Sequence, residues 1–117
     1  MSRIVYDSNW GKYHNKKIVV DGETFDSAKE YSRWCELKML ERAGEITDLE
    51  RQKRFELIPT QKIDGKTVER PVSYIADFCY VENGKVVVED CKGMRTDVYI
   101  IKRKLMLFIH GIRVRET

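Results

Sequence analysis

The chain contains few cysteines and no long apolar run, and both absences exclude classes of protein. Its three cysteines, Cys35, Cys79 and Cys91, are odd in number and lack the spacing of zinc ligands. We interpret them as small core residues of a reduced, cytoplasmic protein. We expect no signal peptide. We also expect no membrane span, because the longest apolar candidate, residues 99–109, is interrupted by three basic side chains.

The net charge is also small, +3 from 22 basic and 19 acidic residues. Such a charge permits nucleic-acid binding without demonstrating it. Charged residues make up 35% of the chain and hydrophobic residues 42%, which is typical of a soluble globular protein. At 117 residues, with no repeats and no low-complexity segments, one domain with its own core is expected.

Hydrophobic periodicity and turn residues predict an α/β fold with a mixed β-sheet flanked by helices. Residues 1–17 are polar and end in the basic run KYHNKK, so we expect an N-terminal tail followed by a single domain over 18–117. The core order is α, β, β, β, α, β. The predicted helices cover 26–42 and 97–109, and the predicted strands cover 16–20, 49–62, the two arms of a hairpin within 74–92, and 112–115.

The first predicted helix opens with a capping-box pattern, Ser27-x-x-Glu30. On a helical wheel Glu30 also lies close to Trp34 and Leu37, on the broad apolar side. Two interpretations stay open. Glu30 either serves only as the third residue of the cap, or it points toward the sheet and contacts a metal ion or water.

The second predicted helix carries an apolar stripe at helical spacing, formed by Val98, Ile101, Leu105 and Phe108. We expect this stripe to lie in the core. Residues 102–104, which are all basic, form either a solvated face or a phosphate-binding face.

The stretch YIADFCYVENGKVVVEDCKG, residues 74–93, reads as a β-hairpin. Asn83-Gly84 is the strongest short signal for a two-residue type I′ turn, because both positions need a positive φ. With that turn, the numbers of facing residues sum to 167, so Asp77 faces Asp90 directly. Lys92 lies two residues beyond Asp90 and shares its face.

Facing like charges destabilise a sheet. At roughly 5 Å and an effective dielectric of about 20, the repulsion between the two aspartates is on the order of 3 kcal/mol. Three explanations are open: the register slips by one residue, one carboxyl stays protonated, or a cation lies between them. Mg²⁺ often takes one or two carboxylates together with waters and substrate phosphate.

The constellation of Asp77, Asp90, Cys91 and Lys92, with the helical Glu30 before it, resembles the motif of the PD-(D/E)XK nuclease superfamily. It is similar to the arrangement in Holliday-junction resolvases and in the Tn7-type transposon-end nuclease. The segments KYHNKKIVVDGETFDSAKE, AGEI, YIADF and VVEDCKG together resemble a small phage- and prophage-encoded family of uncharacterised proteins in that superfamily. The resemblance covers nearly the whole chain and implies an αβββαβ restriction-endonuclease-like core.

The resemblance implies a role for each matched position. Asp77 and Asp90 would ligate one metal ion, Mg²⁺ or Mn²⁺, with the backbone carbonyl of Cys91 and the carboxylate of Glu30 as further ligands. Lys92 would place the attacking water or neutralise charge on the phosphate. Glu30, Asp77, Asp90 and Lys92 are therefore the expected catalytic residues.

Two departures from the motif bear on this assignment. Ala76 stands where the motif has proline. Glu89 is adjacent to Asp90, so either acid could take the second acidic position. Strand alternation favours Asp90, since Glu89 should point to the opposite face from Asp77.

The resulting hypothesis is a metal-dependent DNA endonuclease, with branched DNA as a specific version, encoded by a phage or mobile element and acting in the bacterial cytoplasm. A homodimer is expected by resemblance to the resolvases. The alternatives are a non-catalytic nucleic-acid-binding protein and a protein-interaction module, in which Trp10 and Tyr13 would matter more than Asp77. The expected contacts to the nucleic-acid backbone are basic side chains of the tail and the second helix: Lys12, His14, Lys16, Lys17, Lys102 and Lys104.

Overall fold

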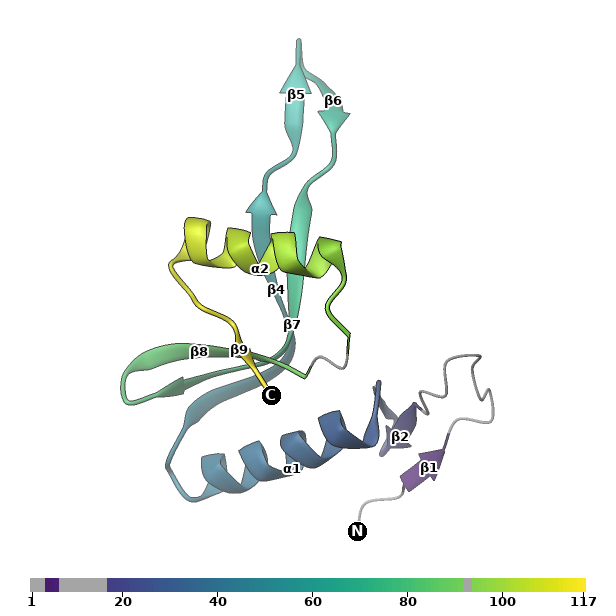
Figure 1. Cartoon of the computed structure of the whole chain (residues 1–117), viewed down its shortest axis with the longest axis vertical. Coiled ribbons are helices and arrows are strands. Elements are labelled where there is room, and N and C mark those ends of the chain that lie inside the picture. The colour runs from purple at the N-terminus through teal and green to yellow at the C-terminus, as the bar shows by residue number, and fades with distance from the viewer. Residues whose placement is uncertain (1–3, 7–16, 92–93) are drawn as a thin grey trace. The chain divides into compact units, whose positions relative to one another are not determined.

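The computed structural model describes residues 4–6, 17–91 and 94–117 (Figure 1). The chain divides into two compact units, residues 1–44 and residues 45–117, and each unit is presented by itself. Neither helix among the described residues is long and apolar enough to cross a membrane.

The first unit contains a small antiparallel sheet followed by a helix. Its strand order is β1-β2-β3, and Asp21-Gly22 supplies the turn between the second and third strands. The first strand lies inside the segment that we expected to be a tail. The elements are β1 (Ile4–Tyr6), β2 (Ile18–Val20), β3 (Glu23–Phe25) and α1 (Ala28–Arg42).

The core of the first unit is built from one face of this sheet and the start of α1. Ile18, Val20 and Phe25 are buried together, and Tyr31 and Trp34 pack against them. Phe25 and Tyr31 meet edge to face, with ring centroids 5.1 Å apart.

The cap of α1 follows the capping pattern of the sequence. The Ser27 hydroxyl accepts a hydrogen bond from the Glu30 backbone N–H at 3.1 Å. The Glu30 carboxylate reaches back and accepts from the Asp26 N–H at 3.0 Å, one residue earlier than in the usual capping box. The interpretation of Glu30 as a capping residue is therefore confirmed, and its side chain is also buried.

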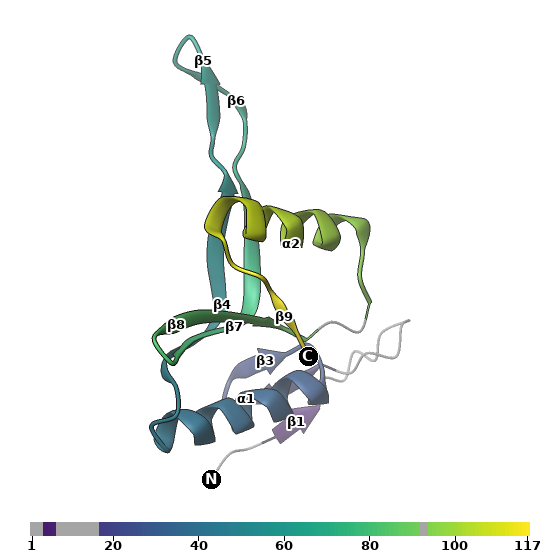
Figure 2. The ribbon, with the colours of Figure 1, turned by 60° about the vertical axis from the view of Figure 1, so that its left-hand side comes forward.

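The second unit is built on a four-stranded sheet with the order β4-β7-β8-β9. β8 and β9 are parallel and the other neighbours are antiparallel, so the expected mixed sheet of an α/β protein is confirmed. Figure 2 shows the chain leaving α2 and returning to β8 as β9. The elements are β4 (Thr47–Ile58), β7 (Val72–Glu82), β8 (Lys85–Asp90), α2 (Asp97–His110) and β9 (Arg115–Glu116).

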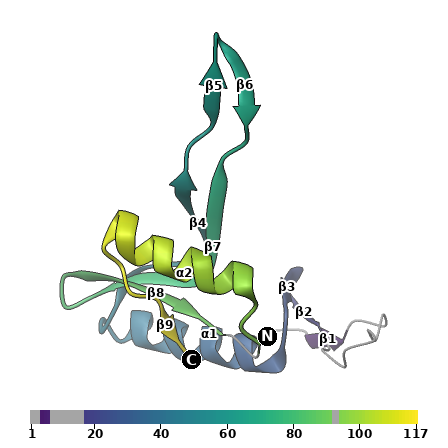
Figure 3. The ribbon, with the colours of Figure 1, turned by 45° about the horizontal axis from the view of Figure 1, so that its top comes forward.

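A two-stranded arm, β5 (Gln61–Ile63) and β6 (Lys66–Glu69), lies between β4 and β7 in the chain. Figure 3 shows this arm extending beyond the ends of β4 and β7. All of its strand residues are exposed. The strand that we predicted over 49–62 therefore ends at Ile58, before Pro59, and a separate hairpin follows.

The register predicted for the β7–β8 hairpin is confirmed. Glu82 pairs with Lys85, and the ladder continues in the same register to Phe78 and Glu89. Asn83 and Gly84 have φ values of 52° and 73°, as a type I′ turn requires.

The prediction that the apolar stripe of α2 lies in the core is confirmed only for Leu105, which is partly buried against the core cluster, and is wrong for the other three residues. Val98, Ile101 and Phe108 are 61%, 57% and 85% exposed. The helix instead buries Tyr99 and Met106, seven residues apart on another face, which pack with the cluster formed by β4, β7 and β8. The residues of α2 are apolar on several sides, so periodicity alone did not identify the packed face.

The three cysteines carry free thiols. Cys79 lies in the core as expected, and its burial raises the pKa of the thiol. Cys35 and Cys91 are only half-buried.

Candidate functional site: an acidic pair beside a basic hollow

The structure brings Asp77 and Asp90 together on neighbouring strands. The last pair of the β7–β8 ladder joins Phe78 and Glu89, so the next two positions are those of the aspartates. The backbone N–H of Cys91 donates to the Asp77 carboxylate at 2.8 Å, which ties the end of β8 to Asp77. We call Asp77 and Asp90 the acidic pair.

The carboxylate of Asp90 is fully buried, and Tyr74 donates its phenol O–H to it. Burial raises the pKa of Tyr74 well above its ordinary value, and the hydrogen bond to Asp90 and the charges of both aspartates raise it further. The phenol therefore stays protonated and serves as a fixed donor to Asp90.

Glu89 has a different set of neighbours from Asp90. It pairs with Phe78 across the ladder and accepts a hydrogen bond from the Tyr80 phenol, on the face that Phe78 and Tyr80 share. The adjacent carboxylates of Glu89 and Asp90 thus bind separate tyrosines. This agrees with the alternation that favoured Asp90 over Glu89 as the partner of Asp77.

A local backbone irregularity lies opposite Asp77. On β4, Arg51 pairs with Phe78 and Lys53 pairs with Ala76, and Gln52 between them has a φ of 54°. Exposed Gln52 thus occupies the left-handed region, which costs a non-glycine residue roughly 1–2 kcal/mol. Strained backbone of this kind clusters at functional sites.

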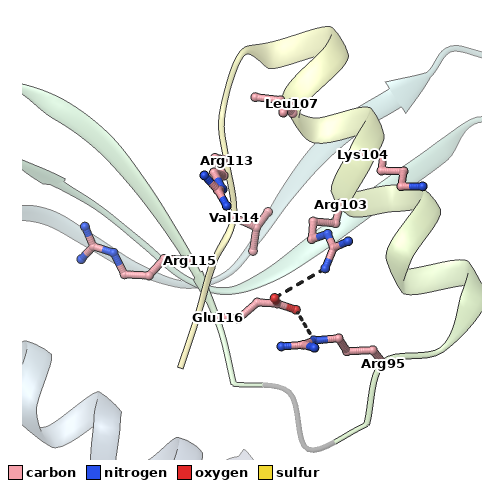
Figure 4. A pocket seen from close by; sticks show the side chains of 8 residues that line it. All are labelled: Arg95, Arg103, Lys104, Leu107, Arg113, Val114, Arg115 and Glu116. Carbon is pink, nitrogen blue, oxygen red and sulfur yellow. Dashed lines mark hydrogen bonds and ion pairs between the residues drawn. The ribbon is translucent and has the colours of Figure 1, made fainter.

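A second feature of this unit is an open hollow of about 790 Å³ beside α2 and β9 (Figure 4). Most of its lining is basic, and we call it the basic hollow. Its lining residues are Arg95, Arg103, Lys104, Leu107, Arg113, Val114, Arg115 and Glu116.

Glu116 is the acidic residue of this lining, and it holds two of the arginines. Its carboxylate accepts from Arg95 Nε at 2.9 Å and is paired with Arg103 at 3.5 Å, as the dashed lines in Figure 4 show. Tyr99 donates its O–H to the same carboxylate at 2.9 Å. Although desolvation acts to raise it, the pKa of Glu116 is lowered by the hydrogen bonds from Tyr99 and Arg95 and by the charges of Arg95 and Arg103.

The acidic pair and the basic hollow are linked through the contacts of two tyrosines. The rings of Tyr74 and Tyr99 lie 6.4 Å apart, between centroids. Tyr74 donates to Asp90 and Tyr99 donates to Glu116. Asp90 and Glu116 are also partners in the parallel β8–β9 ladder, so the two features adjoin.

The donor set of the acidic pair fits a hard divalent ion of the kind that takes two carboxylates and completes its shell with water or phosphate. Within residues 4–6, 17–91 and 94–117 no group of three or more histidine, cysteine or acidic side chains is arranged to hold a metal ion.

The remaining predicted site residues are placed as follows. Glu30 belongs to the first unit and the acidic pair to the second, so a shared site stays a prediction. Lys17 is exposed, Lys102 is half-buried, and Lys104 is exposed in the lining of the basic hollow. Lys12, His14, Lys16 and Lys92 lie outside the described residues.

Sequence reasoning missed Tyr74, Glu116 and most of the basic hollow. The signal that could have indicated the hollow is the concentration of arginines near the C-terminus, at Arg113 and Arg115. It was not sufficient, because the partners Arg95 and Arg103 approach only through the pairing of β8 with β9.

The fold and the site define a small mixed α/β protein in which a pair of carboxylates adjoins a basic surface. Residues 10–113 match the model of a family described as "Protein of unknown function (DUF1064)", and the chain belongs to this family. No curated protein and no solved structure matches the chain.

Proposed function

We propose that this chain is a divalent-metal-dependent nuclease that hydrolyses phosphodiester bonds in DNA. The observation that carries the proposal is the approach of Asp77 and Asp90 on neighbouring strands, fixed by the hairpin register and by the Cys91 N–H bond to Asp77. The order α1, β4, β7, β8, α2, β9 supports a nuclease-like αβββαβ core, with the β5–β6 arm inserted.

The chain's own residues would share the work as follows. Asp77 and Asp90 would hold Mg²⁺ or Mn²⁺, with the Cys91 carbonyl and Glu30 as the further ligands that the resemblance implies. Tyr74 keeps the Asp90 carboxylate in one orientation through its O–H bond. Lys92 would orient a water molecule or neutralise charge on the phosphate.

A bound divalent ion would supply positive charge for the phosphoryl oxygens and make water a stronger acid. We propose DNA as the partner for this chemistry, and we expect a homodimer in the cytoplasm of a bacterial host, by resemblance to the resolvases.

The test is a cleavage assay with Mg²⁺ or Mn²⁺ on labelled four-way junction, flap, duplex and single-stranded DNA. Wild type, Asp90→Asn and Lys92→Ala should be compared with Glu89→Gln. The matched control is Glu89→Gln, because Glu89 is an adjacent buried carboxylate bonded to another tyrosine. We expect cutting that needs the ion, is lost in Asp90→Asn and Lys92→Ala, and survives in Glu89→Gln.

Cleavage that is retained in Asp90→Asn, or lost equally in Glu89→Gln, contradicts the proposal. The second candidate is a non-catalytic nucleic-acid-binding protein. It is favoured by the full burial of Asp90 and its bond to Tyr74. It predicts salt-sensitive DNA binding with no cutting of any substrate.

A further inference from the structure

The basic hollow carries a large excess of positive charge beside α2 and the β9 segment. Figure 4 shows the guanidinium groups of Arg95 and Arg103 directed at Glu116, while Arg115 extends to the other side. Arg115 is engaged there by Glu82 at 3.7 Å and by the Tyr80 hydroxyl at 3.1 Å.

Without Arg115, four basic side chains of the lining remain beside one carboxylate, an excess of three positive charges. Three of the four, Arg95, Lys104 and Arg113, are exposed. Of these three, Lys104 and Arg113 take part in no hydrogen bond or ion pair within the described part of the chain. A local excess of positive charge on a surface attracts anions and raises their local concentration.

Glu116 leaves the two arginines able to bind a further anion. Arg95 uses its Nε–H for Glu116, and a guanidinium carries five N–H donors in a fixed planar fork. The terminal N–H groups of Arg95 are therefore available for planar, two-point contact with phosphate oxygens. Glu116 holds Arg95 and Arg103 in one arrangement without using all of their donors.

The position of the hollow indicates which class of ligand it binds. It adjoins the acidic pair through the Asp90–Glu116 ladder partners and through the Tyr74–Tyr99 contact. A chain of phosphates that occupies the hollow would therefore continue beside Asp90. A single small anion would not make use of both regions.

We infer that the basic hollow binds the phosphodiester backbone of a nucleic-acid strand, and that Glu116 is a positioning residue for its arginines. The placement of the strand beside the acidic pair rests on the proposed function. The contacts are to phosphates, so binding in the hollow is independent of base sequence. The binding residues are Arg95, Arg103, Lys104 and Arg113.

The first experiment measures binding of a fluorescein-labelled single-stranded DNA oligonucleotide in EDTA, by fluorescence anisotropy across a range of salt concentrations. Lys104→Glu combined with Arg113→Glu is compared with Lys62→Glu combined with Lys66→Glu. The second pair lies on the exposed β5–β6 arm of the same unit and makes the same change in net charge. All four lysine and arginine positions are exposed, so the folds should persist.

We expect the hollow variant to lose roughly tenfold or more in affinity, and the arm variant to lose about threefold or less. The slope of log K against log salt should fall by about 1.4 in the hollow variant, since two phosphate contacts are lost on a single strand. Equal losses in the two variants, or an unchanged hollow variant, would overturn the inference.

A second variant tests the positioning role of Glu116. Replacing Glu116 with Gln makes the hollow more positive, so simple attraction predicts tighter binding. If Glu116 positions Arg95 and Arg103, Glu116→Gln should instead bind about threefold more weakly, with a salt slope smaller than that of wild type. Tighter binding would refute the positioning role.

The same samples separate this inference from the nuclease proposal. If DNA binding depends on the hollow residues but the protein cuts no DNA with either ion, the nuclease proposal is refuted and strand binding in the hollow is supported. If cutting depends on Asp90 but is unaffected by the Lys104→Glu and Arg113→Glu changes, the nuclease proposal is supported and strand binding in the hollow is refuted.

Discussion

The acidic pair and the basic hollow hold their charges in opposite ways. Asp90 is fully buried and is bonded to a buried tyrosine, Tyr74. The basic hollow is open, and two of its arginines pair with Glu116, which is partly exposed. A buried carboxylate depends on each donor that it has, whereas an exposed cation remains hydrated when a partner is removed.

The comparison teaches that equal chemical changes should have unequal effects in the two regions. Tyr74 and Tyr99 make the same bond, a phenol O–H to a carboxylate, one in each region. Their partners differ in exposure, so the two tyrosines form a matched pair for testing the difference.

The largest effect is expected from Tyr74→Phe. The change leaves the buried Asp90 carboxylate without this donor, and we expect a loss of about 2 kcal/mol in the free energy of unfolding. Tyr99→Phe should cost about 1 kcal/mol or less, because water can reach Glu116. Urea denaturation measures both, and equal losses would remove the distinction between the regions.

The next effect is the response to alkaline pH. The folded-state pKa of both Tyr74 and Tyr99 is raised above the ordinary value of 10.0, mainly by burial. Their stabilisation is complete below pH 10 and is lost as pH rises, because the unfolded chain releases these protons first.

We expect Tyr74 to account for a loss of about 1 kcal/mol between pH 10 and about pH 11, and Tyr99 for a smaller loss, because solvent screens its surroundings more. Each Tyr→Phe variant should show a shallower decline in stability over this range, measured by urea denaturation at several pH values. If a variant declines as steeply as wild type, the tyrosine that it lacks has the same pKa in the folded and unfolded wild-type chain.

A smaller effect should come from the backbone opposite Asp77. Gln52→Gly relieves the left-handed conformation, and we expect a gain of about 0.5 kcal/mol in the free energy of unfolding after the entropy of glycine is included. Asp48 also has a positive φ, 55°, and Asp48→Gly is the control.

The gain in the control should be smaller, because aspartate tolerates this conformation better than glutamine does. Thermal melting in parallel distinguishes the two variants. A loss of stability in Gln52→Gly would mean that the side chain of Gln52 supports the bend near Asp77.

The smallest effect is expected in the basic hollow. Arg95→Ala removes an ion pair with Glu116 in which the arginine side chain is 60% exposed. Exposed pairs of this kind contribute little, so the free energy of unfolding should change by less than about 0.5 kcal/mol. A loss comparable to that of Tyr74→Phe would show that the hollow is as tightly organised as the acidic pair.

The predictable parts of the fold were those fixed by local chemistry. Asn83-Gly84 fixed the hairpin register, and Ser27 with Glu30 fixed the start of α1. The approach of Asp77 and Asp90 followed from the register. In each case a few neighbouring residues determine the conformation by themselves.

The parts that could not be predicted depend on distant contacts. Val98, Ile101 and Phe108 form a proper helical stripe, yet tertiary packing selected Tyr99 and Met106. The basic hollow depends on the parallel pairing of β8 with β9, which no local pattern specifies. Residue spacing reports which side chains share a face, but not which of two apolar faces is buried.

β9 is only two residues long, so it should detach from β8 more readily than the β7–β8 hairpin opens. The β7–β8 hairpin closes through a local turn of the kind that forms in about 1–10 µs, whereas β9 joins β8 only after α2 has crossed over. In native-state hydrogen exchange, the amide of Thr117, which is bonded to the Asp90 carbonyl, should therefore exchange well before the amides of the hairpin. We expect each such opening to release Glu116 from Arg95 and to leave the Cys91 bond to Asp77 in place, because that bond lies at the end of the hairpin.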